Sequence, residues 1–523
     1  MLRKSLMVRP DDSVAVLLEN AQKGDWIETP RGKIVLRNDV EFAHKVCLEE
    51  LKAGQPVYKY GQEIGRMKED ALPGSWIHSH NMGCERGRTE RTQAAKAQRL
   101  KMEWMGPHPE RQLKFMGYRR PDGSVGVRNH IAVISNVFCA NTAAEKIARQ
   151  IPGAVLFRHN VGCGQIGFDL ELTARTLKSM GCHPNAGAVL IIGLGCERFN
   201  PRELYEAVQK TGKPCALFII QEEGGVRKTV ERAAAKGKEF AQMLAQQQRV
   251  ECSLSELFVT TKCGGTDSTS GLAANPAVGY VADCVVGAGG SAVISELNEL
   301  IGTEDYLAQR AVSDEVERKI YDAVYGIEDF LKGCIEECLP DNRNQLISPG
   351  NFAGGVSSVV EKALGGVHKC GTAPVSDVLD YALPPKKGQK GLFLMSYESV
   401  DGEVTTGMLG CGSQIVCFTT GRGNPTGHPL APVIKITGNH GVYQALEEDF
   451  DFDASPILSQ GRSVEEVGEE LLALLLRVAG GELTSAERNG GEELFCLPRR
   501  HGCRMRLHDD INHNFECGEQ RDF

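Results

Sequence analysis

The sequence has no long apolar run. No stretch approaches the roughly 18 continuous apolar residues that a membrane-spanning helix needs. The basic start of the chain is not followed by the apolar core of a secretory signal. Basic residues are also outnumbered, since 59 Lys and Arg face 68 Asp and Glu and leave a net charge of -9. These shortages predict a cytoplasmic protein that binds neither membranes nor nucleic acid.

Cysteine, by contrast, is plentiful, with 18 in 523 residues. Without a secretory signal these thiols are expected to stay reduced, and most of them to serve as small core side chains. The composition, 41% hydrophobic and 24% charged, is typical of a globular protein, and the length predicts about three domains. An acidic chain of this kind needs a local cluster of Lys, Arg or metal to hold an acidic substrate.

The pattern along the chain predicts an α/β fold in several parts. Short strand-like runs separated by turns make 11–84 a small β-rich domain, and the charged stretch 85–111 is interpreted as a linker. Continuous apolar strands alternate with helical segments in 112–249 and again in 250–495, which indicates a two-part α/β region with parallel sheets. The Cys- and His-rich stretch 496–523 fits no standard zinc spacing and is expected to be a loosely ordered tail.

Two histidines end the β-rich domain. The sequence from Ser75 to Asn81 predicts a strand, and alternation along it puts His78 and His80 on one face. Both imidazoles could then meet one metal or anion. The alternative is a pair of solvated surface histidines.

Three later stretches each place a Cys beside Gly at the end of an apolar strand, around Cys163, Cys196 and Cys263. Glycine lets the backbone approach a ligand, and Cys supplies a soft ligand or a nucleophile. In parallel sheets ligands lie beyond the carboxyl ends of the strands. We therefore expect one site assembled from three loops.

The same loops supply candidates for acid–base chemistry and for substrate binding. His159 is the best-placed base, and Glu197 and Glu296 are carboxylates at strand ends. The polar loop 419–425 suits a carboxylate or phosphate, but it lacks the Lys of a nucleotide-binding P-loop. The candidates for holding an acidic substrate are Arg128, Lys262, Asp267, Lys369 and Arg422.

Taken together, several motifs resemble one family. They are 76–81 (WIHSHN), 117–120 (GYRR), 126–129 (GVRN), 159–164 (HNVGCG), 193–197 (GLGCE), 263–267 (CGGTD), 274–277 (ANPA), 351–355 (NFAGG) and 418–423 (FTTGRG). In this order they resemble the altronate/galactarate dehydratase family over about 11–490. The resemblance implies a SAF-type N-terminal domain and a metal-assisted, usually iron-dependent dehydration of a small sugar acid to a 2-keto-3-deoxy acid. The family also includes sulfolactate sulfo-lyases, which release sulfite.

Removing a proton next to a carboxylate needs a base, and a metal can stabilise the enediolate as a Lewis acid. The residues that could hold such a metal are His78, His80, Cys163, Cys196 and Cys263. Mononuclear Fe2+ is favoured. An iron–sulfur cluster on the three thiolates, or another divalent metal beside structural thiols, stays open.

Three functions remain possible at this point: a sugar-acid hydro-lyase, which is favoured, a carbon–sulfur lyase, and a catalytically silent sugar-acid sensor. The sequence leaves the sugar stereochemistry open. A homo-oligomer is possible.

Overall fold

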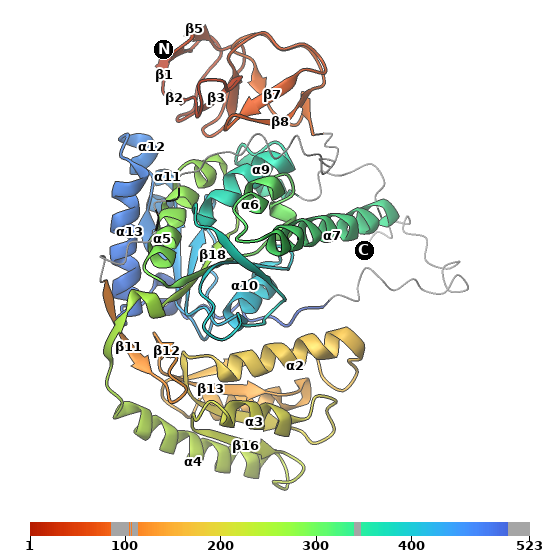
Figure 1. Cartoon of the computed structure of the whole chain (residues 1–523), viewed down its shortest axis with the longest axis vertical. Coiled ribbons are helices and arrows are strands. Elements are labelled where there is room, and N and C mark those ends of the chain that lie inside the picture. The colour runs from red at the N-terminus through yellow and green to blue at the C-terminus, as the bar shows by residue number, and fades with distance from the viewer. Residues whose placement is uncertain (85–103, 105, 107–112, 339–346, 500–523) are drawn as a thin grey trace, which may run out of the picture.

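The structure, a computed structural model, describes the whole chain except residues 85–103, 105, 107–112, 339–346 and 500–523. The predicted linker, apart from Trp104 and Gly106, and most of the predicted tail therefore lie outside the described residues. In the described part, the N-terminal domain lies against the C-terminal α/β region, and the second domain lies on the opposite side of that region (Figure 1). No helix in this part is both long and apolar enough to cross a membrane.

Short strands joined by turns build the N-terminal domain in three small sheets, ordered β2-β3-β6-β9, β1-β4-β5 and β10-β8-β7. Their apolar residues, among them Ile27, Val46 and Ile77, are fully buried and close two small cores. The strands are β1 (Leu2–Arg3), β2 (Ser5–Leu6), β3 (Val14–Leu17), β4 (Trp26–Thr29), β5 (Gly32–Val35), β6 (Lys45–Cys47), β7 (Pro56–Lys59), β8 (Gln62–Met67), β9 (Trp76–Ile77) and β10 (Met82–Gly83).

The second domain contains a four-stranded parallel sheet, ordered β14-β13-β15-β16. Helices cover both faces, so its strands can be apolar throughout; all eight residues of β15 are buried. The sheet strands are β13 (His130–Ser135), β14 (Ala154–Phe157), β15 (Ala186–Gly193) and β16 (Cys215–Ile219), and the helices are α1 (Asn141–Ala148), α2 (Gly167–Cys182), α3 (Pro201–Gln209) and α4 (Val226–Ala245). An antiparallel sheet beside it holds β11 (Lys114–Arg119), β12 (Val125–Gly126) and β17 (Val250–Ser253).

The C-terminal region is built on a seven-stranded sheet in which every pairing is parallel, ordered β20-β21-β19-β18-β22-β23-β24. Its strands are β18 (Phe258–Cys263), β19 (Ser291–Ile294), β20 (Val375–Leu379), β21 (Gly391–Met395), β22 (Ile415–Thr419), β23 (Val433–Thr437) and β24 (Phe452–Asp453). The helices around it are α5 (Asn275–Gly287), α6 (Glu304–Ala308), α7 (Asp314–Cys338), α8 (Pro349–Ala353), α9 (Val359–Val367), α10 (Asp401–Gly410), α11 (His440–Ala445), α12 (Pro456–Ser459), α13 (Val464–Ala479) and α14 (Ser485–Arg488).

This architecture confirms the predicted α/β class, with a small β-rich N-terminal region and parallel sheets behind it. The prediction of a strand from Ser75 to Asn81 is wrong. Strand β9 stops at Ile77, and the chain turns because Asn81 Oδ1 accepts a hydrogen bond from the backbone N–H of His78 at 3.0 Å. Alternation along a strand therefore says nothing about the two histidines.

Candidate active site at the carboxyl edge of the seven-stranded sheet

Two central strands of the large sheet deliver polar side chains to its carboxyl edge. Strand β18 ends in Lys262 and Cys263, and β19 runs on into Glu296. Glu296 has a left-handed backbone with φ of 67°, which is uncommon for a residue with a side chain and is typical of functional sites. The short helix Leu297–Glu299 follows and carries Glu299 to the same place.

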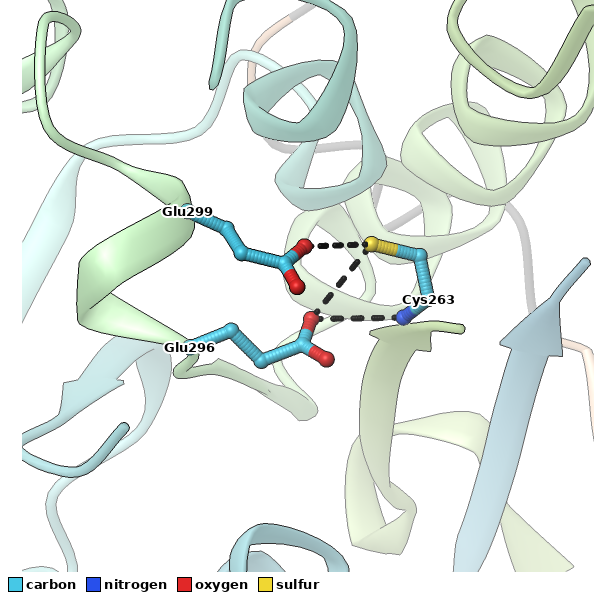
Figure 2. A group of neighbouring side chains, drawn as sticks. All are labelled: Cys263, Glu296 and Glu299. Carbon is cyan, nitrogen blue, oxygen red and sulfur yellow. Dashed lines mark hydrogen bonds between the residues drawn. The ribbon is translucent and has the colours of Figure 1, made fainter. Parts of the chain in front are cut away.

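Cys263, Glu296 and Glu299 form a compact group, which we call the thiol–carboxylate triad (Figure 2). The thiol donates to Glu299 Oε2 at 3.2 Å and lies 3.6 Å from Glu296 Oε2. All three side chains are buried, and one ligand atom from each lies within 4.8 Å of the others. Burial, together with Glu296, raises the pKa of the Cys263 thiol well above its usual range.

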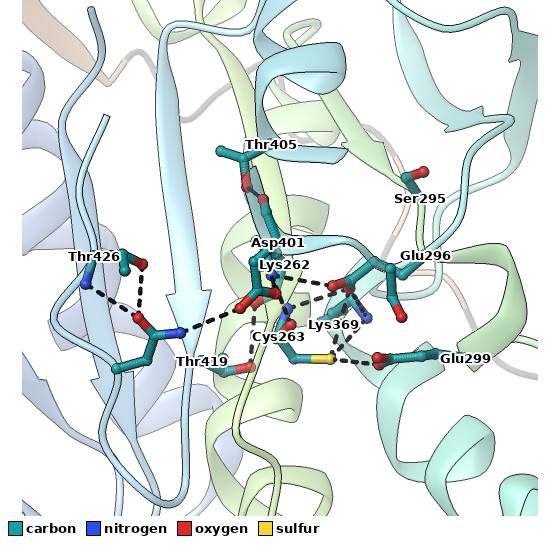
Figure 3. Close-up of polar contacts among 12 residues, drawn as sticks. Lys262, Cys263, Ser295, Glu296, Glu299, Lys369, Asp401, Thr405, Thr419 and Thr426 are labelled. Atoms are coloured by element: carbon teal, nitrogen blue, oxygen red, sulfur yellow. Dashed lines mark hydrogen bonds and ion pairs between the residues drawn. The ribbon is translucent and has the colours of Figure 1, made fainter. Parts of the chain in front are cut away.

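Lysines surround the triad (Figure 3). Lys369 Nζ lies 2.7 Å from Glu296 Oε2 and 3.2 Å from Cys263 Sγ, and Lys362 Nζ lies 3.0 Å from Glu299 Oε1. Burial opposes the charge on Lys369, yet the facing Cys263, Glu296 and Glu299 raise its pKa above the usual range. Burial likewise opposes the charge on Glu299, but Lys362 and Lys369 lower its pKa. These ion pairs compensate groups that would be costly to bury alone.

A third lysine links the triad to solvent. Lys262 Nζ lies 3.4 Å from Glu296 Oε1 and 2.5 Å from Asp401 Oδ1, at the start of α10. Lys262 is fully buried, whereas the Asp401 side chain is 43% exposed. Asp401 therefore marks the side of the cluster that lies nearest to solvent.

The donors of the triad suit a divalent metal. A thiolate and two carboxylates are ligands that Fe2+ and Zn2+ accept, and a thiol that coordinates a metal loses its proton. The Lys369 ammonium now contacts two of the three donors, so it would have to give way to a metal. If a divalent metal replaces the Lys369 ammonium, the three side chains of the triad fit the metal.

Glycines let the loops 263–267 and 419–425 pack against each other at the carboxyl edge of the seven-stranded sheet. Gly421 and Arg422 both donate their backbone N–H to Gly265 O, at 3.1 and 3.0 Å. A Cβ on Gly421 would lie 2.1 Å from Asp267 Oδ1, so only glycine fits there. The Arg422 side chain is exposed at this rim, beside Gly350. Its predicted role in holding an acidic substrate is compatible with this place.

Asp267, also predicted to bind substrate, has another role in the structure. It is buried, and its Oδ1 accepts from Thr269 Oγ1 at 2.6 Å and from Ser270 N at 3.0 Å. Its Oδ2 accepts from Asn439 Nδ2 at 3.0 Å. Oδ1 therefore holds the helical turn that follows, and Oδ2 ties the loop to Asn439. Both oxygens have partners within the protein, and a role in substrate binding stays a prediction.

His159, the predicted base, lies at the carboxyl edge of the other sheet, in the second domain. Its Nε2 donates to Ser135 O at 2.8 Å, and its Nδ1 accepts from Val161 N at 3.3 Å. Burial lowers the pKa of the ring to about 4. Both nitrogens are engaged with the backbone, so the ring holds its own loop and has no nitrogen free to take a substrate proton.

Glu197 and two of the three predicted thiols lie at that same second edge. Glu197 accepts hydrogen bonds from Leu194 N at 3.1 Å and Gly195 N at 2.7 Å, which shapes its own loop. Cys163 and Cys196 are exposed. Among the described residues, the triad is the only group of three or more His, Cys, Asp and Glu side chains close enough together to hold a metal. The predicted gathering of three thiols at one point is therefore absent from the structure.

Arg128, which was predicted to bind substrate, makes its contacts within the protein itself. Its guanidinium pairs with both oxygens of Glu487, at 2.6 and 2.8 Å, and donates to Val478 O and Glu482 O, both at 2.9 Å. The side chain is buried. Its donors are used in fastening the second domain to α13 and α14, which leaves none for a substrate.

The two N-terminal histidines are separate from the triad. His78 Nε2 donates to Phe352 O at 3.0 Å, and its Nδ1 lies 2.9 Å from Ser79 Oγ. Burial, followed by the nearby Lys45, lowers the pKa of His78 to about 4. The exposed His80 packs on Trp76, with ring centroids 4.7 Å apart. Neither ring belongs to the triad, and the metal ligation expected of the two histidines stays a prediction.

Sequence reasoning missed three residues of the cluster: Glu299, Lys362 and Asp401. Glu299 follows Glu296 by three residues, a spacing that brings side chains together on a helical turn. That signal was available, but it needed the short helix to be recognised. Lys362 and Asp401 come from distant segments and left no local signal.

Three family models match successive parts of the chain. They are the altronate/galactarate dehydratase SAF domain at 3–85, the galactarate dehydratase/altronate hydrolase second domain at 117–245, and the galactarate/altronate dehydratase C-terminal domain at 254–501. Altronate dehydratase of Bacillus subtilis is 33% identical over 503 residues, which cover 94% of this chain and 98% of that protein. The chain belongs to the altronate/galactarate dehydratase family.

Two more proteins similar to this chain bear on its reaction. Altronate dehydratase of Escherichia coli is 32% identical over 92% of this chain and 96% of its own length. The (2R)-sulfolactate sulfo-lyase subunit beta of Chromohalobacter salexigens is 38% identical over 74% of this chain and 97% of its own length. Family membership confirms the resemblance seen in the motifs and makes the chain a hydro-lyase, an enzyme that breaks carbon–oxygen bonds.

Proposed function

We propose that this enzyme removes water from an altronate- or galactarate-like sugar acid and forms a 2-keto-3-deoxy acid at the thiol–carboxylate triad. The observation that carries the proposal is the set of three buried lysines around the triad, in a chain of the dehydratase family. Such a cluster of cations is what an acidic substrate needs on an otherwise acidic protein.

The lysines suit the first step of the reaction. Loss of a proton next to a carboxylate moves negative charge onto the carboxylate oxygens, and fixed cations stabilise that charge best in a water-poor site. Lys262 is the lysine that pairs with Asp401, and Arg422 stands at the rim. We assign both to the substrate carboxylate, and Lys369 to the charge that develops during the step.

We assign the proton transfer to Asp401. Its carboxylate is the most exposed of those in the cluster and is oriented by Lys262. Glu296, the predicted catalytic carboxylate that does lie here, is fully buried, and we assign it with Cys263 and Glu299 to a metal, Fe2+ by preference. When bound, such a metal supplies Lewis-acid stabilisation of the substrate oxygens.

The runner-up is a carbon–sulfur lyase acting on a 2-hydroxy-3-sulfonate. The sulfo-lyase subunit beta is 38% identical over 387 residues, whereas the Bacillus subtilis altronate dehydratase is 33% identical over 503 residues. Both reactions begin with proton loss next to a carboxylate, so one set of lysines serves either.

One assay separates these candidates. The purified protein, reconstituted anaerobically with iron, is incubated with altronate, galactarate and sulfolactate. We expect keto-deoxy acid from a sugar acid, and release of sulfite from sulfolactate alone would overturn the dehydratase proposal. Iron analysis with a visible spectrum of the same sample tests the cofactor. Absorption equivalent to about one cluster per chain would contradict mononuclear iron. Homo-oligomer formation and a cytoplasmic location stay predictions.

A further inference from the structure

Residues 351–362, which run from α8 into α9, contact both the N-terminal domain and the candidate active site. On its inner side this stretch contacts the triad. Lys362 Nζ lies 3.0 Å from Glu299 Oε1 and donates to Asn351 Oδ1 at 2.8 Å, and Asn351 Nδ2 donates to Thr266 O at 2.9 Å. The stretch 351–362 therefore supplies the ammonium group that faces Glu299.

On its outer side the same stretch is held by charges from the N-terminal domain. Lys45 Nζ lies 2.9 Å from Glu361 Oε2, and Lys59 Nζ lies 2.8 Å from Glu361 Oε1. All three side chains are at least 98% buried. Removing one partner of a buried ion pair is strongly destabilising, because it leaves a buried charge without compensation. Glu361 directly precedes Lys362, so adjacent residues of α9 face the N-terminal domain and the triad.

Backbone contacts hold the start of the stretch. His78 Nε2 donates to Phe352 O at 3.0 Å, and Lys45 Nζ donates to Gly355 O at 2.7 Å. These two carbonyls follow closely after Asn351. The N-terminal domain thus fixes the stretch 351–362 at both ends, and Figure 1 shows that domain lying beside α9.

We propose that His78, Lys45 and Lys59 are positioning residues for the active site. By holding the stretch 351–362 from outside, they place Lys362 against Glu299. None of the three touches the triad, so each acts through Lys362. This assigns His78 a hydrogen-bonding role in place of the metal ligation expected from the sequence. The measurements of kcat and KM rest on the proposed function, whereas the measurement of hydrogen–deuterium exchange does not.

The first test compares His78→Gln with His78→Ala. A glutamine amide can donate to Phe352 O as the imidazole does, but it is a poor substitute for an imidazole at iron. We expect His78→Gln to keep kcat within about twofold and His78→Ala to lose at least roughly tenfold, because small misplacements in an active site are costly. Both should bind as much iron as the unmodified enzyme. Lys52→Met, on the exposed surface of the same domain, is the control and should change neither quantity.

Two results would overturn the proposal. If His78→Gln loses iron and activity together, His78 is a metal ligand. If His78→Ala keeps full kcat, the contact with Phe352 does not position the site. KM should change less than kcat in His78→Ala, because Lys362 acts on the triad and the substrate ligands at the rim remain.

The second test needs no substrate. Glu361→Gln removes the charge that pairs with Lys45 and Lys59, and hydrogen–deuterium exchange is followed over 348–367. We expect faster exchange in this stretch and little change in the second domain. Unchanged exchange over 348–367 overturns the proposal. If exchange becomes faster in the whole protein, the substitution has destabilised the fold, and the comparison of His78→Gln with His78→Ala decides. If no acid is turned over, the proposed function fails while the exchange result still decides this one.

Discussion

Lys369 Nζ lies 3.2 Å from Cys263 Sγ and 2.7 Å from Glu296 Oε2, so a single ammonium group contacts two of the three donors of the triad. In this arrangement a lysine supplies the positive charge that a bound metal would otherwise supply. We therefore expect Lys369 and a bound metal to compete for the same donors, and the triad to be destabilised when neither cation is present.

Lys369→Met should expose this competition. Without the ammonium group, Glu296 keeps only the more distant Lys262 as a charged partner, and we expect the thermal midpoint to fall by several degrees. Added Fe2+ should raise the midpoint more in the variant than in the unmodified protein, because a ligand stabilises the state that binds it best. Thermal unfolding with and without Fe2+ measures both. Equal stabilisation by iron in the two proteins contradicts the competition.

The three predicted thiols should separate in their effects. Cys263→Ser removes the only thiol of the triad, so we expect bound iron to fall and kcat to drop by roughly a hundredfold. Cys163→Ser and Cys196→Ser change exposed side chains at the other sheet and should keep activity within about threefold. Iron content and steady-state kinetics of the three variants provide the comparison. Equal loss of iron in all three variants would instead support an iron–sulfur cluster held by the three thiolates.

The two arginines predicted to bind substrate should also differ. Arg128→Met leaves the half-buried Glu487 without its charged partner, and we expect a lower thermal midpoint with KM nearly unchanged. Arg422→Met removes an exposed charge at the rim, and we expect KM to rise roughly tenfold with stability unchanged. Thermal unfolding and kinetics on both variants measure the contrast. A raised KM in Arg128→Met at unchanged stability would return that residue to the substrate site.

The fold class and about half of the candidate site can be predicted from the apolar strands in the sequence. Parallel sheets bind ligands at their carboxyl edges, so Lys262, Cys263 and Glu296 could be found by locating the ends of apolar strands. The chain has two such sheets, however, and local sequence does not say which edge is active. His159 and Cys163 stand at one edge as plausibly as Cys263 does at the other.

The remaining errors have a common origin in long-range contacts. His159 is engaged by Ser135, 24 residues earlier, and Arg128 by Glu487, 359 residues later. Nothing near His159 or Arg128 in the sequence reveals these partners. Lys362 was likewise missed because its place depends on contacts with a different domain on the other side of α9.

Buried neutral histidines should make the fold sensitive to acid. Burial lowers the pKa of His159 to about 4 and that of His183 to about 3, from an ordinary value of 6.5. Between pH 6.5 and about 4 the unfolded chain therefore binds more protons than the native state, and stability falls as the pH falls through this window. Each pKa unit corresponds to about 1.4 kcal/mol, so the loss from His159 reaches on the order of 3 kcal/mol by pH 4.

His159→Gln tests this sign directly. The amide cannot take up a proton in this range, so the variant should be less stable than the unmodified protein at pH 7 but should lose less stability between pH 6.5 and 4. Thermal midpoints measured at half-unit intervals give both slopes. His80→Gln, which changes an exposed ring, is the matched control and should keep the slope of the unmodified protein. An identical slope in His159→Gln would show that protonation of His159 does not drive the acid transition, and the backbone contacts to Ser135 and Val161 would then have to survive in the charged ring.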